Sequence, residues 1–469
     1  MSFTSVPFLW FLTIFLVLYA FCPQRYRRYL LLVSSGVFVA WSSITGLGWA
    51  LLFTLVNWVL GICIRRTQRP KAVMGMAVAI NALALVTFKL LNVGVLGLSY
   101  YLFAFIAYLV EVYRGTVEAE LDPLRFAGFS LFFPKFTMGP ITRYSELGSQ
   151  LDKARLTASG IQKGLEDFTL GFILKILVSD KLGVFFGEGY YALQTVGYDA
   201  ISTKLAWLGA VVTSLHIYIE WISYMYMALG IARMLGYRLP ENFNFPYIAR
   251  TVGDYYRRWH MTLTRWFKDF IYIPLGGNRK GLARTIVNIL FVWLLTSLWH
   301  GSNLASNYLI WGMSIGVMIV LERLWRRFVI ERFRVGEKLG TETLAGKLWK
   351  LLVSVLAHVW VVIPMILTWV VFTIRDLDQL GLYFSRLFPA AGSSAGADPA
   401  DFAKNWALVG PAVLVGVIFC FPIVDWLIRL LKRSKLGSWI LSALLAGLFW
   451  YAVYQLVRNG SDPMGYAAF

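Results

Sequence analysis

The chain has 469 residues, of which 58% are hydrophobic and 15% are charged, and its formal net charge at pH 7 is +19. This composition excludes an ordinary soluble domain and indicates a polytopic membrane protein, in which apolar helices of about 20 residues cross the bilayer. The excess of Lys and Arg is typical of cytoplasmic loops in an inner-membrane protein, so it does not require a nucleic-acid partner.

Apolar runs predict an all-α chain with about twelve transmembrane helices. The basic joints Arg25–Arg28 and Arg65–Lys71 alternate with the uncharged joint Ser42–Gly46. By the positive-inside rule, basic joints such as these and Arg323–Lys338 lie in the cytoplasm, whereas the stretch Ala390–Ala400 and both termini lie in the periplasm. The predicted spans are residues 5–22, 29–44, 46–63, 72–88, 96–110, 166–185, 205–232, 285–300, 307–323, 351–372, 409–429 and 437–456.

The apolar segment Ala127–Tyr144 is interrupted by Pro134, Gly139 and Pro140, so no unbroken run in it is long enough to cross a bilayer. It fits a re-entrant or broken helix, which membrane proteins tolerate where protein or water surrounds the freed backbone groups. An ordinary apolar loop is an equally good interpretation of the sequence alone.

The span 205–232 carries His216 and Glu220 one helical turn apart, and hence on one face of the helix. Ionisable groups at membrane depth are costly, so they usually face a bundle interior or a cavity. The pair therefore indicates either polar residues lining a tunnel or a structural clamp.

The segment 233–285 is rich in Lys and Arg and is placed in the cytoplasm by its charge. Within it, apolar and polar residues recur at helical spacing, which predicts an interfacial or re-entrant amphipathic helix that ends at Pro274. The apolar face is Trp259, Leu263, Trp266 and Phe270, and the polar face is Arg258, Thr262, Arg265 and Asp269.

Two histidines are the candidate catalytic residues, because imidazole takes up and returns a proton near neutral pH. His300 ends an apolar run beside Gly301, which leaves the backbone room for a substrate; a buried histidine bonded to a carbonyl is the alternative. His260 lies among Arg257, Arg258 and other basic residues that suit the phosphates of a nucleotide-bearing thioester or, alternatively, anionic lipid. No spacing predicts a metal site, and the three cysteines are too scattered for one.

Several motifs together resemble the membrane-bound O-acyltransferase (MBOAT) family, and more narrowly its bacterial branch of AlgI-like polysaccharide O-acetyltransferases. The motifs span roughly residues 130 to 325 in order, and their combined length makes chance agreement improbable. They are Phe133–Pro134, Met138–Tyr144 (MGPITRY), Gly236–Tyr247 (GYRLPENFNFPY), Asp254–Leu263 (DYYRRWHMTL), Trp266–Arg279 (WFKDFIYIPLGGNR) and Leu298–Gly301 (LWHG).

The resemblance implies a ring of helices around a central tunnel, with a cytoplasmic opening for the acyl donor. It implies that His300, in the Trp-His-Gly motif, is the principal catalytic residue and that His260 assists it. The donor is expected to be acetyl-CoA, with no tightly bound cofactor. Expected partners are a periplasmic SGNH-type acetyltransferase, a polysaccharide synthase complex and membrane lipid, but no nucleic acid. Candidate donor-binding residues are Arg257, Arg258, Arg265, Trp299 and Asn278.

One stretch departs from the family pattern. Where relatives usually read Tyr-Phe-Asp-Phe-Ser-Gly-Tyr-Ser-Asp-Met-Ala, Tyr218–Ala228 reads YIEWISYMYMA, which keeps the first carboxylate as Glu220 but places Tyr226 at the second acidic position. The serine positions are Ile222 and Met225. The departure suggests a subgroup distinct from typical alginate systems, such as one that serves acetylated cellulose.

We therefore expect N-terminal transmembrane helices over residues 1–126, an MBOAT catalytic core over 127–325 and C-terminal transmembrane helices over 326–469. The expected function is an O-acetyltransferase component that moves acetyl from a cytoplasmic thioester across the inner membrane for O-acetylation of a secreted exopolysaccharide of the cellulose or alginate type. The alternatives are DltB-like transfer of D-alanine from a carrier protein, and a non-catalytic polymer-export or transport subunit.

Overall fold

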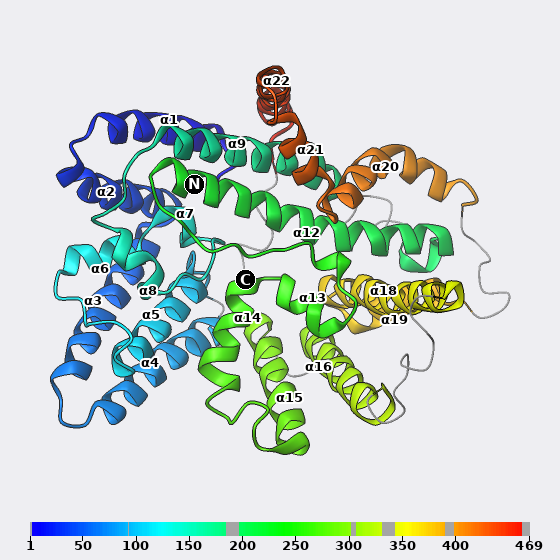
Figure 1. Ribbon diagram of the computed structural model, residues 1–469, viewed down its shortest axis with the longest axis horizontal. Coiled ribbons are helices and arrows are strands. Elements are labelled where there is room, and N and C mark those ends of the chain that lie inside the picture. The colour runs from blue at the N-terminus through cyan, green and yellow to red at the C-terminus, as the bar shows by residue number, and fades with distance from the viewer. Residues whose placement is uncertain are drawn as a thin grey trace. The chain divides into compact units, whose positions relative to one another are not determined.

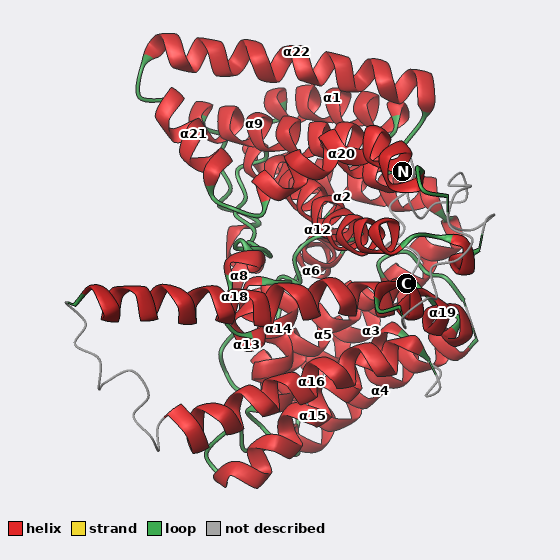
Figure 2. Cartoon of the chain, turned by 90° about the vertical axis from the view of Figure 1, so that its right-hand side faces the viewer, coloured by secondary structure: helices red, strands yellow, loops and turns green. Residues whose placement is uncertain are grey.

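The computed structural model describes residues 2–91, 93–183, 197–301, 306–330, 343–389 and 398–461. All regular elements in these ranges are helices (Figure 2), which confirms the predicted all-α fold class. Eight of the described helices are long and apolar enough to cross a membrane, and α1 and α5 are shorter apolar helices. The count of about twelve crossings stays a prediction. Most of the basic joint Arg323–Lys338, from residue 331 on, and most of Ala390–Ala400 lie outside the described residues.

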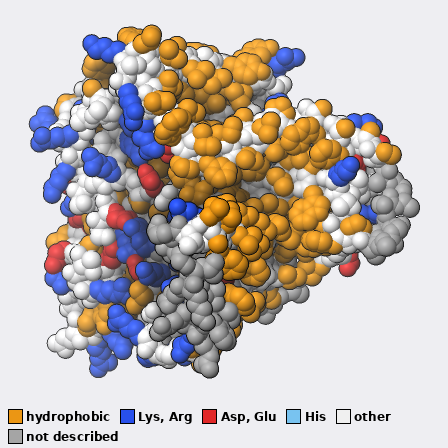
Figure 3. Space-filling view, turned by 45° about the vertical axis from the view of Figure 1, so that its right-hand side comes forward, with side chains coloured by type: hydrophobic (Ala, Val, Ile, Leu, Met, Phe, Trp, Pro, Cys, Tyr) orange, Lys and Arg blue, Asp and Glu red, His pale blue; other side chains and the backbone are white. Residues whose placement is uncertain are grey.

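The surface fits a lipid environment. Apolar side chains cover broad, continuous areas of the face shown in Figure 3. In the candidate span Pro70–Leu90 (α4), only 11% of the most apolar window is buried within the protein, and the corresponding share in Lys435–Asn459 (α22) is 17%. Because such surfaces are unfavourable in water, these helices face lipid.

The chain divides into two compact units. Unit 1 comprises residues 1–177, 220–242 and 434–469, and unit 2 comprises residues 178–219 and 243–433. The long helix α12, Thr203–Met234, contributes residues to each. The other main helices of unit 1 are α1 (Val6–Phe21), α2 (Gln24–Ser42), α3 (Ile44–Arg66), α4 (Pro70–Leu90), α5 (Leu98–Tyr113), α6 (Pro123–Ser130), α7 (Phe133–Phe136), α8 (Tyr144–Leu147), α9 (Ala158–Leu174) and α22 (Lys435–Asn459). Those of unit 2 are α10 (Asp180–Gly183), α13 (Val252–Arg258), α14 (Met261–Phe267), α15 (Gly281–His300), α16 (Asn307–Trp325), α18 (Leu344–Thr373), α19 (Leu377–Leu387), α20 (Asp401–Phe419) and α21 (Ile423–Leu431).

In unit 1, the helices α3, α4 and α5 pack against one another (Figure 1). Asn57 of α3 and Asn81 of α4 are fully buried, and each amide donates a hydrogen bond to the other, at 3.1 and 2.7 Å. Each also donates to a backbone carbonyl one turn back in its own helix. A pair of this kind fixes the two helices together, because a lone buried amide would lose its hydrogen bonds.

Helix α9 packs closely on the unit 1 part of α12 through glycines. A Cβ atom added at Gly171 would lie 2.4 Å from the carbonyl oxygen of Ser223, and one added at Gly164 would lie 2.5 Å from that of Gly230. The reverse also holds, since a Cβ at Gly230 would lie 2.5 Å from the carbonyl oxygen of Gly164. Small residues thus let the two backbones approach, as in other membrane helix pairs.

We expect the substitution Gly171→Val to force α9 away from α12 and to lower the free energy of unfolding by about 1–3 kcal/mol. Gly447→Val is the matched control, because a Cβ at this helical glycine of α22 meets nothing within 4 Å. Thermal unfolding of both variants in the same detergent measures the difference. Equal unfolding midpoints for Gly171→Val and Gly447→Val would contradict the close approach of α9 to α12.

The interrupted segment after residue 122 forms the short helices α6, α7 and α8, which confirms a broken helix. Pro134 stands in the first turn of α7, where its missing amide hydrogen costs nothing. The segment is not a surface loop, because the residues from Phe129 to Thr142 are buried. Gly139 is required there, since its Cβ would lie 2.2 Å from the Cα of Lys135.

The predicted single span 409–429 is wrong. Helix α20 ends at Phe419, and a separate helix, α21, begins at Ile423. Pro422 lies at the junction and has no amide hydrogen for a helical bond, so an unbroken helix does not continue through it. The apolar residues Trp426 and Leu427 of α21 are exposed on the protein, as expected for a helix that contacts lipid.

Candidate active site

His300 is the last residue of α15 and is buried, with 7% of its surface exposed. Aromatic rings surround its imidazole. The ring centroid of Trp299 lies 4.5 Å away, that of Phe372 lies 5.0 Å away and that of Trp311 lies 5.1 Å away. Tyr308 stacks on the imidazole at 6.0 Å. The histidine thus lies in an apolar pocket of unit 2, where water is largely excluded and charge–dipole interactions are strong.

Three helices build this pocket. α15 packs along α16, and α16 packs on α18 (Figure 1). Tyr308 and Trp311 come from α16, and Phe372 comes from the end of α18. The sequence predictions did not identify these aromatic residues. Their only signal was an aromatic spacing of three residues within an apolar helix, which lipid-facing residues also show.

Gly301 has a different role from the one expected. A Cβ at this position would lie 2.5 Å from Cδ2 of Tyr308. The space beside the backbone is therefore taken by the ring that covers His300, and not left open for a substrate. The glycine allows Tyr308 to approach the histidine.

His260 lies at a break between α13 and α14. The predicted amphipathic helix is present from Met261 to Tyr272, as α14 and the π-helix Lys268–Tyr272, but its predicted first residues are wrong. His260 adopts the left-handed conformation with φ of 44° and serves as the N-cap of α14, so Arg258 and Trp259 lie before the break. The hydroxyl of Thr264 donates to the carbonyl of Tyr256 at 2.9 Å across the break. A histidine tolerates this conformation better than branched residues do. Strain of this kind is found at functional sites in other proteins.

The side chain of His260 is not part of the basic surface. It is only 3% exposed, and burial lowers the pKa of its imidazole to about 3. The ring is therefore neutral near pH 7, because desolvation disfavours its charged form. A neutral imidazole can orient a polar group but adds no positive charge for a phosphate.

Glu322 of α16 anchors the helix that leads to His260. Its carboxylate accepts hydrogen bonds from the amides of Val252 at 2.6 Å and Gly253 at 3.3 Å, at the N-terminus of α13. The indole of Trp360 donates to the same carboxylate at 3.0 Å. A carboxylate at a helix N-terminus satisfies amides that have no partner in the helix and complements the helix dipole.

A continuous set of aromatic contacts joins the surroundings of the two histidines. Trp259, beside His260, lies 4.7 Å from Trp369 of α18, measured between ring centroids. Trp369 lies 5.5 Å from Phe372, which contacts His300. The indole of Trp369 also donates to the hydroxyl of Tyr255 at 3.2 Å. The fold thus brings residues near 260, 300 and 370 into one packed cluster within unit 2.

The candidate donor-binding arginines differ in exposure. Arg258 is held by Asp254 at 2.9 Å and by the carbonyl of Asn244 at 3.2 Å. Arg257 also pairs with Asp254, at 3.1 Å, but 68% of its side chain is exposed. Arg265 is partly buried. Arg257 is therefore the most accessible of the three to a ligand in solution.

The other two donor candidates are separated in the fold. Asn278 is exposed in the turn before α15, whereas Trp299 lies at the opposite end of that helix against His300. A helix of 20 residues is about 30 Å long. One small group therefore cannot contact both residues.

His216 and Glu220 lie on one face of α12, as predicted, but each contacts the segment that follows α9. Glu220 forms an ion pair with Lys175 at 3.4 Å in unit 1, and the side chains are 9% and 1% exposed. The Nδ1 atom of His216 lies 3.1 Å from the carbonyl oxygen of Ser179 in unit 2. These contacts favour the structural clamp over tunnel-lining residues.

The departing residues of α12 are part of the packed interior of unit 1. Ile222 and Met225 are 5% and 4% exposed, and the amide of Asn242 donates to the sulfur of Met225 at 3.3 Å. Apolar packing thus takes the two positions where the family pattern was expected to have serine.

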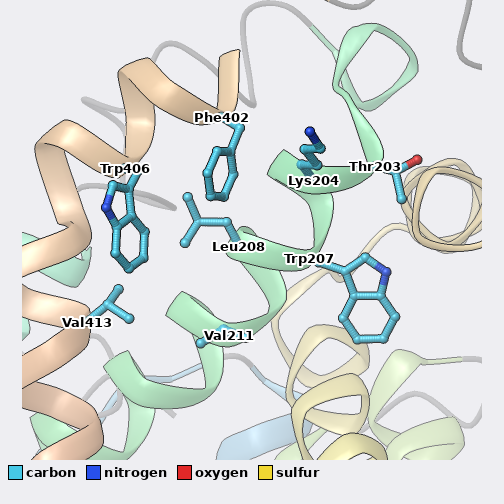
Figure 4. Close-up of a pocket in the computed structure, with 8 residues that line it drawn as sticks. All are labelled: Thr203, Lys204, Trp207, Leu208, Val211, Phe402, Trp406 and Val413. Carbon is cyan, nitrogen blue, oxygen red and sulfur yellow. The ribbon is translucent and has the colours of Figure 1, made fainter. Parts of the chain in front are cut away.

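An open pocket of unit 2 is separate from the histidines. It has a volume of about 410 Å³ and lies between α12 and α20, where Trp207, Phe402 and Trp406 line it (Figure 4). Lys204 is the charged residue of its lining. This pocket lacks a group suited to proton transfer, so it does not replace the histidine pocket as the candidate active site.

Comparison with known proteins agrees with the motifs. The model of the membrane-bound O-acyltransferase family matches residues 118–338. A protein of Pseudomonas putida named "Probable alginate O-acetylase AlgI" is 35% identical over 351 residues, which cover 69% of this chain and 71% of that protein. The peptidoglycan O-acetyltransferase of Helicobacter pylori is 34% identical over 43% of this chain and 38% of its own length.

A teichoic acid D-alanyltransferase of Bacillus subtilis is more distant, at 26% identity over 50% of this chain and 60% of its own length. The identity to AlgI relatives extends over two thirds of the chain, the family model covers both His260 and His300, and the structure is all-helical in its described ranges, with apolar surfaces. The chain therefore belongs to the membrane-bound O-acyltransferase family and is an O-acyltransferase of the membrane.

Proposed function

We propose that the protein transfers acetyl groups from a cytoplasmic thioester, acetyl-CoA, across the inner membrane for O-acetylation of a secreted exopolysaccharide of the cellulose or alginate type. The observation that carries this proposal is the buried position of His300 at the end of a membrane-length helix, within an aromatic pocket. The chain has a higher sequence identity to AlgI relatives than to D-alanyltransferases, which supports acetyl as the transferred group.

Acyl transfer to an acceptor hydroxyl requires that the hydroxyl lose its proton as its oxygen attacks. As a general base, the imidazole of His300 takes this proton while the hydroxyl oxygen attacks the thioester carbonyl, and the thiolate then leaves with the proton. As an acyl acceptor, the imidazole attacks the thioester carbonyl and displaces the thiolate, and the acceptor hydroxyl then attacks the acetyl-imidazole, which releases the imidazole with the hydroxyl proton. The surrounding rings of Trp311 and Phe372 keep water away, which limits loss of acetyl by hydrolysis in either case.

The arrangement has a physical rationale. A nucleotide thioester is highly charged and cannot cross lipid, whereas an acetyl group can pass through a protein. In this proposal, Arg257 meets the donor phosphates on the cytoplasmic side, and both termini lie in the periplasm. A periplasmic SGNH-type acetyltransferase would receive the acetyl group, and a polysaccharide synthase complex would be the other partner.

The identity of the donor can be tested in inverted membrane vesicles. One sample receives labelled acetyl-CoA, the other receives a carrier protein charged with labelled D-alanine, and transfer of the label is measured. We expect transfer from acetyl-CoA, and Arg257→Gln should raise the KM for it about fivefold, which corresponds to ~1 kcal/mol for an exposed ionic contact. Arg66→Gln is the matched control, because Arg66 is also exposed and is placed on the same side by charge. Transfer from the D-alanyl carrier alone would overturn the proposal in favour of D-alanylation.

A further inference from the structure

A second polar cavity lies in unit 1, beside the broken helix. It is bounded by α5, by α6 and α7, and by the backbone that follows α7, and Tyr100, Tyr101 and Lys135 line it. Two glycines shape it. Gly97 has φ of +71°, and its Cβ would lie 2.2 Å from the carbonyl oxygen of Phe136, while Gly139 packs directly on Lys135. The backbone of α7 is thereby fixed with Lys135 turned toward the interior.

Lys135 is an unusual residue for this environment. It is 6% exposed, and its Nζ atom has no hydrogen-bond acceptor among the described residues. One side of the ammonium lies 3.8 Å from the ring centroid of Phe129. Burial lowers the pKa of the Lys135 ammonium to about 7, and the charge of Glu146 acts in the opposite direction. A buried ammonium with only a ring beside it is costly, so a further partner is expected.

The other free groups at this cavity can also donate. The hydroxyls of Tyr100 and Tyr101 are buried and have no hydrogen-bond partner among the residues that the structure describes. By contrast, the Ser130 hydroxyl bonds to Thr54 at 2.8 Å, and the Thr142 hydroxyl donates to the carbonyl of Pro140 at 3.0 Å. The groups left over are therefore one ammonium and two phenol hydroxyls, and no carboxylate lines the cavity.

The size of the cavity restricts the ligand. The volume open to a water-sized particle is about 10 Å³, which is room for about one water molecule. A nucleotide or a carboxylic acid does not fit. A water molecule would fit, but it would leave the positive charge of Lys135 without a counter-charge, whereas a monatomic anion can accept hydrogen bonds from an ammonium and from hydroxyls and also neutralises the charge.

We infer that this cavity binds a single small anion of halide size, held by the Lys135 ammonium and the hydroxyls of Tyr100 and Tyr101. The anion would join α5 to the broken helix and so stabilise unit 1. The inference is independent of the acyl donor, because it concerns a site in unit 1 and is measured by stability.

The test is thermal unfolding of the full chain in detergent at pH 6.0, in sodium chloride, in sodium bromide and in sodium gluconate of equal ionic strength. A ligand that binds only the folded state raises the midpoint, so we expect both halides to raise it by a few degrees in a saturable manner, relative to gluconate. Lys135→Met should abolish the difference between halide and gluconate. The exposed Lys153 provides the matched control, and Lys153→Met should retain it.

Tyr101→Phe removes one hydroxyl and keeps the ring, so it tests the site even if Lys135→Met does not fold. We expect it to move the half-saturating halide concentration upward several-fold. If the unfolding midpoint of the unaltered protein is the same in halide and in gluconate, the inference is wrong and the cavity holds a buried water molecule. A halide effect that persists unchanged in Lys135→Met or in Tyr101→Phe would show that halide binds elsewhere, and would overturn it equally.

Discussion

The substitution His300→Ala is expected to reduce acyl transfer by about 10²–10⁴-fold, which is the usual contribution of a positioned general base. The imidazole is enclosed by Trp311, Phe372 and Tyr308, and of these four side chains only the imidazole takes up a proton near neutral pH. His300→Gln should be similarly inactive, because it keeps a polar side chain of similar size but cannot take up the proton. Both variants should be measured by transfer of label from acetyl-CoA in vesicles.

The control is His358→Ala, since His358 lies in α18 and is only partly buried. This variant should keep its activity. Equal thermal midpoints for His300→Gln and the unaltered protein would separate lost chemistry from lost folding. Undiminished transfer by His300→Ala, at a normal level of membrane insertion, would remove His300 from the mechanism.

The second large effect is expected at the ion pair of Lys175 and Glu220. The substitution Glu220→Gln leaves the Lys175 ammonium buried without its carboxylate, and should lower the free energy of unfolding by about 3–5 kcal/mol. The cost arises because both side chains are nearly inaccessible to water, so solvent cannot replace the lost partner. Denaturant unfolding in detergent micelles measures it.

The double variant Lys175→Met with Glu220→Gln removes the charge as well as its partner, and should recover much of the stability lost in Glu220→Gln. The exposed ion pair of Lys404 and Asp398 is the matched control, with side chains 69% and 50% exposed. Asp398→Asn should leave stability unchanged, because solvent screens exposed pairs. A fully stable Glu220→Gln protein would show that Lys175 has sufficient other partners.

The sequence predicted the helical elements well where hydropathy alone decides them. The bounds of α1, α3, α4 and α16 agree with the predicted spans to within a few residues. The errors occur where a single residue changes the backbone. Pro422 ends one helix and begins another, and His260 adopts positive φ in the middle of a helical pattern. A periodic pattern of apolar residues predicts neither the break at Pro422 nor the positive φ of His260.

The sequence by itself determined that the chain is an all-helical membrane protein, and its motifs identified His300 and His260 as the candidates for chemistry. Tertiary structure alone decided what faces them: the aromatic rings of Tyr308, Trp311 and Phe372 around His300, and the carboxylate of Glu322 that holds the helix before His260. The physical reason is that helical periodicity tells which residues share a face of one helix. The partners of that face come from other helices, and only the packing of those helices selects them.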